Sequence, residues 1–166
     1  RNHMTTEIEM FTSGACPRNP GPGGWACLLR NPSKEKLISG NVRRSTNNRL
    51  ELHAAIVGLR ALKKPSCVVV TTDSKYIVDG ITTYIKSWKA KKWSHNQSGS
   101  KPVKNAELWQ KLDQLCEKHE VTWKWVSKQS AHPENDRVDD EALEQAKLAR
   151  AELKQEIAAR KAIAKR

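Results

Sequence analysis

The sequence predicts an α/β domain in which helices pack on a five-stranded mixed β-sheet. Short runs that alternate in polarity or are rich in β-branched residues occur at five places, and such runs are typical of strands. Longer runs with apolar residues three and four apart lie between and after them, as in amphipathic helices. The order is three strands, a helix, a strand, helices, a strand and a helix, which favours a mixed sheet covered by helices.

The first part of the chain predicts a meander of three strands. Residues 8–12 alternate apolar and polar side chains, as a half-buried strand does. A Gly- and Pro-rich run at 19–24 is expected to form a tight loop. Two further short apolar or mixed runs predict strands over 25–30 and 36–42.

The middle of the chain predicts helices on either side of one buried strand. From Asn48 the apolar residues recur at three and four, which predicts a helix that ends near Lys64. The β-branched run 67–72 predicts a buried central strand. Residues 74–85 then predict a helix with an interruption at Gly80.

The last part predicts a helix, a strand and a long C-terminal helix. A polar loop over 94–101 precedes a predicted helix over 106–116 and a strand over 121–126. After Pro133 there is no Gly or Pro to the end of the sequence, which predicts one long helix. Its apolar stripe is expected to consist of Ala142, Ala146, Ala149, Leu153 and Ile157.

Length and composition exclude several classes of protein. The 166 residues correspond to one domain, and 37% hydrophobic residues suffice for a core, so extensive disorder is excluded. No run is apolar and long enough for a membrane helix, and no apolar N-terminal run is typical of a secretory signal. We therefore expect a cytoplasmic protein with no membrane attachment. The reduced thiols expected there are Cys16, Cys27, Cys67 and Cys116, which are widely spaced.

Three segments are distinguished along the chain. Residues 1–3 precede Met4, and the His-Met pair is a common cloning scar, so they are expected to be an artificial remnant. The domain is expected to span 4–146, followed by a basic helical extension over 147–166. Because charges of both signs are mixed in this tail, a solvated helix is favoured over a second binding site.

The charge balance predicts a polyanionic partner. Thirty Lys and Arg against 18 Asp and Glu give a net charge of +12, which points first to nucleic acid and second to an acidic membrane. Between Asp79 and Glu107 there is no acidic residue. Lysines neutralise phosphates and flat rings pack against sugars or bases, so this stretch favours nucleic-acid binding, with a solvated helix face as the alternative. The stretch contains Lys86, Lys89, Lys91, Lys92, Lys101 and Lys104, interleaved with Tyr84, Trp88 and Trp93.

Three acidic residues stand at junctions between predicted elements. Glu51 lies in the first turns of a helix, Asp73 ends a buried strand, and Asp139 lies at the start of the last helix. Each has a structural alternative, because acidic side chains also cap and stabilise the N-termini of helices.

Six motifs follow one another along the chain. They are FTSGAC (11–16), NPGPGG (19–24), TNNRLEL (46–52), TDS (72–74), KPVKN (101–105) and HPEN (132–135). Together they resemble type 1 ribonuclease H, the bacterial form, from about Glu7 to Ala146. The resemblance implies a ribonuclease H-like fold, a monomer without an obligate protein partner, and magnesium-dependent hydrolysis of the RNA strand of RNA/DNA hybrids.

The resemblance also implies a metal site. It assigns Glu51, Asp73 and Asp139 as ligands of two Mg²⁺ ions, with Mn²⁺ as the alternative cation. Two ions about 4 Å apart must be held by few protein ligands, which leaves room for phosphate and water. One ion then activates the attacking water and the other stabilises the leaving oxygen.

The sequence departs from the family at two catalytic positions. The family has Asp after the Thr of the first strand, where this chain has Ser13, and that Asp bridges both metal ions. Serine is neutral and a poor magnesium ligand. A loop His of the family is replaced by Gln129, which can hydrogen-bond but cannot shuttle a proton. His132 belongs to the HPEN motif and is expected to be structural, with compensation for the missing His as the alternative.

The resemblance assigns further residues to the two strands of a hybrid. Cys16, Asn19, Asn47 and Asn48 line the RNA side, where amide and backbone groups meet 2′-hydroxyls. Arg44, Thr46 and Asn105 form a pocket for a DNA phosphate. Tyr84 and Trp88 contact the DNA strand, and the basic protrusion carries Lys89, Lys91 and Lys92. As alternatives, loop amides satisfy turns and tryptophans serve the core, a role we expect for Trp109, Trp123 and Trp125.

Two functional hypotheses stay open at this point. The first is a ribonuclease H that still cleaves, weakly or with manganese. The second is a hybrid-binding protein of the same fold that has lost its chemistry. A third, a general binder of duplex DNA or RNA, is disfavoured because the RNA-side and DNA-side residues are both present.

Overall fold

The five predicted strands form one sheet in the order β3-β2-β1-β4-β5. The structure is a computed structural model that describes residues 7–130 and 132–166, so the expectation for residues 1–3 lies outside it. Strands β1 to β3 pair in antiparallel fashion, whereas β4 is parallel to both β1 and β5, which makes the sheet mixed as predicted. The strands are β1 (Glu7–Ala15), β2 (Gly21–Arg30), β3 (Glu35–Ser45), β4 (Cys67–Thr72) and β5 (Glu120–Trp125).

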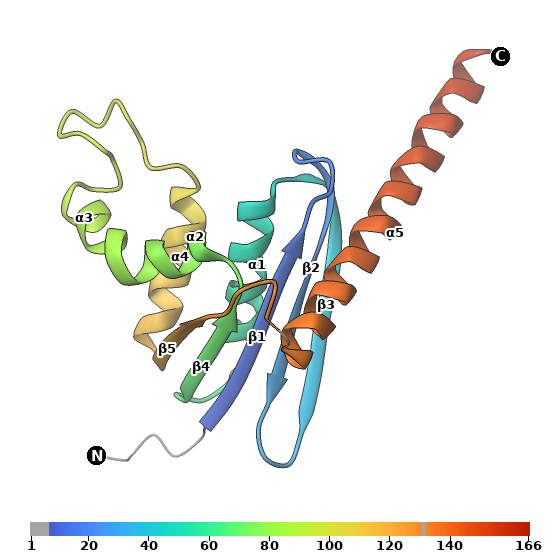
Figure 1. Cartoon of the computed structure of the whole chain (residues 1–166). Coiled ribbons are helices and arrows are strands. Elements are labelled where there is room, and N and C mark those ends of the chain that lie inside the picture. Colours follow the sequence, from blue (N-terminus) through green and yellow to red (C-terminus); the bar gives the residue numbers. More distant parts are fainter. Residues whose placement is uncertain (1–6, 131) are drawn as a thin grey trace.

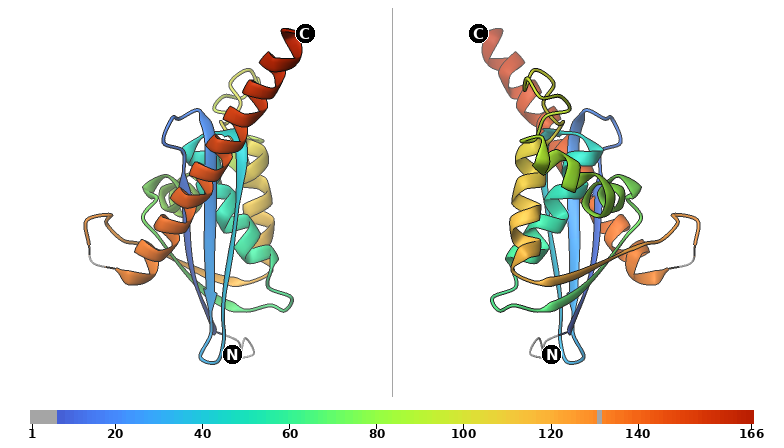
Figure 2. Two further views of the ribbon diagram at one scale, coloured as in Figure 1. Left: turned by 90° about the vertical axis from the view of Figure 1, so that its right-hand side faces the viewer. Right: turned by 90° about the vertical axis from the view of Figure 1, so that its left-hand side faces the viewer.

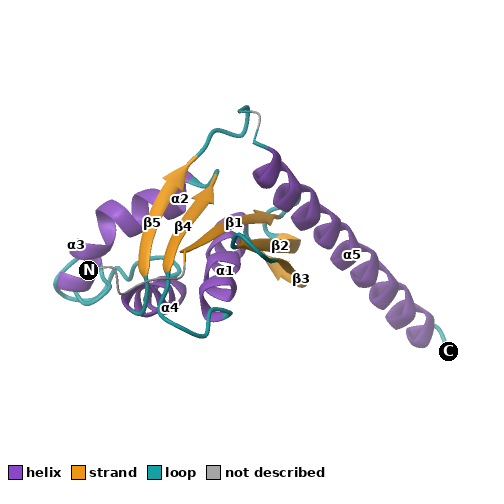
Figure 3. Cartoon of the chain, turned by 90° about the horizontal axis from the view of Figure 1, so that it is seen from below, coloured by secondary structure: helices purple, strands orange, loops and turns teal. Residues whose placement is uncertain are grey.

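Helices cover both faces of the sheet (Figures 1 and 3). One face is covered by α1, against which α4 packs, and the long helix α5 crosses the other face over β1, β2 and β3. The helical elements are α1 (Asn47–Arg60), α2 (Lys75–Asp79), the π-helical turn η1 (Gly80–Tyr84), α3 (Ile85–Ala90), α4 (Ala106–Glu117) and α5 (Pro133–Ala164).

Strand β1 supplies both halves of the core because successive side chains point to opposite faces of a sheet. Met10 belongs to the larger cluster under α1 and α4, which also contains the fully buried Trp109. Phe11 belongs to the smaller cluster under α5, together with Val138 and Ala142. The core role expected for Trp109 is therefore confirmed.

Helix α5 lies directly on the backbone of β2. A Cβ added to Gly24 would collide with the Ala142 carbonyl, so only glycine allows this approach. The distal part of α5 extends past the sheet, as Figure 2 shows. Within the described residues no helix is long and apolar enough to cross a membrane.

Two predictions at the ends of elements are wrong. The loop expected over 19–24 ends earlier, because β2 already begins at Gly21; its glycines serve close backbone approach rather than a turn. The first helix ends at Arg60 rather than near Lys64, where the Ala61 N–H is shared between two carbonyls and tightens the last turn.

Two predictions about burial are also wrong. Ile157 is 43% exposed, because α5 has left the sheet at that point and only the earlier part of the alanine stripe is covered. Trp125 is 44% exposed on the edge strand β5 instead of serving the core. Trp123 is half-buried against the larger cluster.

Candidate active site and nucleic-acid interface

Glu51 lies in the first two turns of α1 and is buried. The helix begins where the Thr46 hydroxyl accepts a hydrogen bond from the Arg49 N–H at 3.2 Å. Strand β1 comes very close to this turn, since a Cβ on Gly14 would lie 2.7 Å from the Glu51 nitrogen. Gly14 therefore lets strand and helix meet, and its N–H donates to the Glu51 carboxyl group.

Asp73 is held at the carboxyl end of β4. Ser74 next to it begins α2, and its hydroxyl accepts a hydrogen bond from the Ile77 N–H at 3.3 Å. The Asp73 carbonyl accepts a hydrogen bond from Trp125 Nε1 at 3.1 Å. The exposed Trp125 thus anchors the backbone of a candidate catalytic residue.

Asp139 is half-buried near the start of α5 and contacts β1 directly. Ser13 Oγ donates a hydrogen bond to Asp139 Oδ1 at 2.5 Å. The first turn of α5 is tied to the sheet by Arg30, whose guanidinium pairs with Glu134 at 2.9 Å. The structure therefore brings Ser13 and Asp139, which are far apart in the sequence, into contact.

The electrostatics show that the three carboxyl groups share one region. Burial raises the pKa of Glu51 well above its usual range, the neighbouring Asp73 charge raises it further, and Lys128 opposes the shift. Burial also raises the pKa of Asp139 to about 6; the Ser13 hydrogen bond opposes this rise and the Asp73 charge adds to it. Glu51, Asp73 and Asp139 therefore repel one another in a weakly solvated site.

A cavity of about 300 Å³ opens beside these carboxylates. Glu51 and Asp73 line it together with Asn47 and Asn48 from the start of α1. Two lysines, Lys75 and Lys128, also line it and were not singled out from the sequence. The Lys75 ammonium lies 5.6 Å from the centre of the Trp125 ring, a cation–π contact that holds its side chain.

The donor chemistry of this region fits a hard divalent cation, but the full set does not converge. Carboxylate oxygens are the ligands that Mg²⁺ and Mn²⁺ accept. Glu51 Oε1 and both carboxylate oxygens of Asp73 are buried without a hydrogen-bond partner among the described residues. Across residues 7–130 and 132–166, however, no group of three or more His, Cys, Asp or Glu side chains is arranged to hold one ion. Asp139 instead bonds to Ser13.

Gln129, at the position of the family's loop His, and His132, the alternative that could compensate for it, both contact other partners. Gln129 is exposed, and its Oε1 accepts a hydrogen bond from the Ser127 hydroxyl at 2.8 Å. The His132 ring packs near the Phe11 ring, with 6.0 Å between the centroids. Its Nδ1 lies 3.6 Å from Glu134 in the first turn of α5. These contacts favour the structural role expected for His132.

The residues predicted for the RNA side are joined by hydrogen bonds. The Cys16 N–H donates to Asn47 Oδ1 at 2.8 Å, and the Asn47 N–H donates to Asn19 Oδ1 at 3.2 Å. Asn47 and Asn48 are both exposed at the rim of the cavity. The loop after β1 and the start of α1 therefore form one polar surface.

The residues predicted for the DNA phosphate lie beside a network that the sequence did not reveal. Asn105 Oδ1 accepts a hydrogen bond from Arg49 Nη1 at 3.0 Å, and Asn105 Nδ2 donates to the Tyr76 hydroxyl at 3.1 Å. Arg49 also lines a cavity of about 230 Å³ with Arg44. The sequence feature that could have pointed to Arg49 was its position directly after Asn47 and Asn48, which were both assigned to substrate binding.

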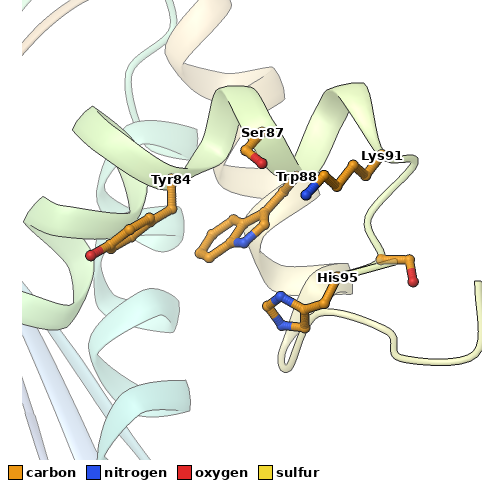
Figure 4. Close-up of a pocket in the computed structure, with 6 residues that line it drawn as sticks. Tyr84, Ser87, Trp88, Lys91 and His95 are labelled. Carbon is orange, nitrogen blue, oxygen red and sulfur yellow. The ribbon is translucent and has the colours of Figure 1, made fainter. Parts of the chain in front are cut away.

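The basic protrusion carries an open aromatic pocket of about 380 Å³, shown in Figure 4. The Tyr84 and Trp88 rings stack with 6.1 Å between centroids, and Tyr84 is 53% exposed. Lys91 lines the same pocket. Lys89 is engaged elsewhere, since its ammonium lies 2.9 Å from Asp113 on α4.

Comparisons with known proteins agree with this architecture. The model of the family described as RNase H matches residues 5–147. The chain is 52% identical over 134 residues to "Ribonuclease H" of Hydrogenovibrio crunogenus, which covers 81% of this chain and 91% of that protein. It is 50% identical over 141 residues to "Ribonuclease H" of Mesorhizobium japonicum, covering 85% and 78% of the two chains.

Solved structures show the same fold. The chain resembles the crystal structure of LC9-RNase H1, a type 1 RNase H with the type 2 active-site motif, with a TM-score of 0.75 and 28% identity over 86% of this chain and 72% of that one. It also resembles LC11-RNase H1, solved in complex with an RNA/DNA hybrid, with a TM-score of 0.57 and 19% identity over 84% and 98% of the two chains. At that identity the second likeness concerns the fold alone.

Proposed function

Because this chain belongs to the ribonuclease H family, we propose that it binds RNA/DNA hybrids and hydrolyses their RNA strand slowly, in a metal-dependent reaction. The observation that carries this proposal is that Glu51 and Asp73 line one cavity with exposed amides on its rim, while Asp139 lies near enough to interact with both charges. Each acidic residue comes from a different element, so their proximity is a property of the fold.

The three carboxylates would hold Mg²⁺ or Mn²⁺. The bound cations supply Lewis acidity and lower the pKa of a bound water. Glu51 and Asp73 offer buried oxygens that have no hydrogen-bond partner among the described residues, and binding a cation relieves the repulsion between them. The Ser13 hydrogen bond occupies one oxygen of Asp139 and would leave the other for a cation, and a less complete ligand set is a physical reason for slow turnover.

The polar rim supports the proposed choice of substrate. Asn47 and Asn48 present amide groups at the cavity, where they can hydrogen-bond the 2′-hydroxyls that distinguish RNA from DNA. On the other side, Tyr84 and Trp88 present flat rings, and Lys91 provides a positive charge for a DNA backbone. Lys128 lies near Glu51 and Asp139 and offsets part of the negative charge that would repel a phosphate.

A second candidate function is hybrid binding without cleavage. It is favoured by Ser13, which stands where the resemblance implies a charged ligand, and by its hydrogen bond, which occupies one oxygen of Asp139. The neutral, exposed Gln129 adds to it, since glutamine transfers no proton at ordinary pH. Both candidates share the substrate and differ only in turnover.

One pair of assays tests the proposal. A labelled hybrid is incubated with the protein in Mg²⁺ and in Mn²⁺, alongside the Asp73→Asn variant as a control for contaminating nuclease. Metal-dependent cleavage by the unaltered protein alone supports the enzyme, and its absence leaves hybrid binding as the function.

Binding is measured in parallel at one fixed salt concentration, against the hybrid and against double-stranded DNA of the same sequence. We expect a preference for the hybrid that weakens when Asn47 and Asn48 are changed to Ala. Equal affinities for the two duplexes would overturn both candidates, because phosphate contacts alone do not distinguish them.

A further inference from the structure

A groove between the β1–β2 loop and α5 carries three cations that lie outside the site described above. Its volume is about 220 Å³. This is smaller than the roughly 300–1,000 Å³ of sites that enclose a whole small molecule, and it suits one moiety of a longer ligand. The floor is made by Pro17, Pro22 and Leu143, and the cations are Arg18, Lys147 and Arg150.

The walls of this groove are held in place by backbone contacts. Leu143, Lys147 and Arg150 recur at four and three along α5, so they share one face of the helix. The helix cannot move toward the sheet at this level, because its backbone already lies against Gly24 of β2. The helix side of the groove is therefore fixed by the packing of α5 on the sheet.

The cations are available for a ligand. Arg18, Lys147 and Arg150 are exposed, and none of them forms an ion pair within the described part of the chain. The acidic residues farther along α5 are occupied, since Glu152 and Glu156 pair with Arg43 of β3 at 3.5 and 2.6 Å. Three positive charges around an apolar floor suit a phosphate with a base or ribose attached.

The position of the groove indicates which strand could reach it. The loop that supplies Arg18 also supplies Cys16 and Asn19, which are hydrogen-bonded to Asn47 on the RNA side of the site. The protrusion around α3, proposed for the DNA strand, lies on the opposite flank of the sheet from the distal part of α5 (Figure 1). The groove therefore adjoins the surface proposed to bind the RNA strand and lies away from the surface proposed to bind the DNA strand.

We propose that this groove binds the RNA strand where it continues beyond the hybrid. One phosphate would lie among Arg18, Lys147 and Arg150, and its base or ribose would pack on the apolar floor. The proposal rests on the hybrid-binding function proposed above and adds a contact to single-stranded RNA. It also gives the first part of the C-terminal extension a binding role in place of the solvated helix expected from the sequence.

Fluorescence anisotropy at fixed salt tests the proposal with three kinds of probe. The three kinds are a blunt hybrid, the same hybrid with its RNA strand extended (one probe at the 5′ end and one at the 3′ end), and the same hybrid with its DNA strand extended. We expect an RNA extension at one end to tighten binding by about 5-fold, the lower end of the gain from one stacked base, because the groove offers apolar side chains but no aromatic ring. A DNA extension is expected to add much less.

The variant Arg18→Ala/Lys147→Ala/Arg150→Ala removes the three cations. It is expected to lose the gain from the RNA extension, and the salt slope for the extended probe should fall by about 0.7, the value for one single-strand phosphate contact. Its affinity for the blunt hybrid should change little. The matched control is Arg160→Ala/Lys161→Ala/Lys165→Ala, which removes the same charge from the exposed end of α5 and should keep the gain.

The remaining outcomes overturn the proposal. In the first two, the groove variant keeps the affinity gained from the RNA extension, or the control variant loses that affinity as the groove variant does. In the other two, DNA and RNA extensions raise the affinity equally, or no extension raises it. Loss of preference for the blunt hybrid over double-stranded DNA would instead overturn the proposed function. The two failures are therefore distinguishable.

Discussion

Ser13 on β1 donates a 2.5 Å hydrogen bond to Asp139 on α5, and this contact links the strand and the helix that frame the candidate active site. It places a neutral donor at the position where the resemblance to type 1 ribonuclease H leads us to expect a fourth carboxylate. A donor beside Asp139 lowers the repulsion among the acidic residues, whereas a carboxylate would raise it. At position 13, serine therefore favours the stability of the fold, whereas a carboxylate would favour cation binding.

The variant Ser13→Asp tests this opposition directly. We expect hybrid cleavage to rise by about 10²-fold or more, because the added ligand positions the cations. We also expect the free energy of unfolding to fall by about 1–3 kcal/mol in metal-free buffer, as four carboxylates then repel one another. Cleavage assays and thermal melts measure the two effects.

Ser13→Ala is the matched control for that experiment. It removes the hydrogen bond without adding a ligand, so it should destabilise the protein by about 1–3 kcal/mol and leave cleavage no faster. If Ser13→Asp raised neither cleavage nor divalent-cation affinity, the result would support hybrid binding without cleavage as the function.

Gln129→His is expected to matter only when the metal ligands are complete. In the Ser13→Asp background it should raise cleavage by about 10²-fold, the size of one positioned proton-transfer group. In the unaltered background the gain should be small, because Gln129 lies exposed in its loop and bonds to Ser127. A large gain in the unaltered background would contradict the view that Ser13 limits turnover.

The protrusion should contribute to binding through Lys91 and Lys92 more than through Lys89. Changing Lys91 and Lys92 to Ala should lower the salt slope for a hybrid by about 2, at roughly 0.9 for each lost phosphate contact. Lys89→Ala should change it less, because that ammonium is paired with Asp113 at 2.9 Å. Titrations across a series of salt concentrations measure both slopes, and equal effects of the three lysines would contradict this assignment.

His119 gives the fold a pH dependence that is separate from the active site. Its Nδ1 accepts a hydrogen bond from the Ser66 N–H at 3.1 Å, and burial followed by the charge of Lys118 lowers its pKa. Because the folded-state pKa lies below the unfolded value of about 6.5, its contribution to stability is complete above that pH and declines as the pH falls toward the folded-state pKa.

The expected loss is about 1 kcal/mol, the net worth of one hydrogen bond. Urea unfolding between about pH 7.5 and pH 5 measures it, with pH 6.5 as the upper edge of the transition. His119→Asn is the control, since its side chain does not titrate and the variant should lose this part of the pH dependence. An identical pH profile in the variant would show that other groups are responsible.

The sequence predicted those parts of the fold that depend on local patterns. β4 was predicted to the residue, because a buried β-branched run has few other uses. Trp125 was misassigned to the core, since its exposure depends on β5 being the edge strand, and no local pattern reports that. The early start of β2 was missed because its glycines serve close approaches to other segments, such as that of Gly24 to α5, a helix far away in the sequence.

The candidate site was predictable only in part, because some of its residues act through contacts with residues far away in the sequence. The acidic residues were found because they stand at the junctions of elements and belong to motifs. The roles of Arg49 and Lys128 depend on tertiary contacts, with Asn105 for the first and with Glu51 and Asp139 for the second. The sequence pattern around a charged residue, whether Arg49 in the first turn of α1 or Lys128 in a loop, does not indicate which distant residue it will contact.

The uninterrupted helix α5 fixes the distance between the carboxylate region and the groove proposed to bind RNA. Asp139 and Arg150 stand on the same uninterrupted helix, 150 − 139 = 11 residues apart. At about 1.5 Å per residue the two levels are separated by roughly 16 Å along its axis. A strand that advances about 3.4 Å per nucleotide covers this span in roughly five nucleotides. An RNA bound both at the groove and at the carboxylates would therefore have a fixed number of nucleotides between the two contacts.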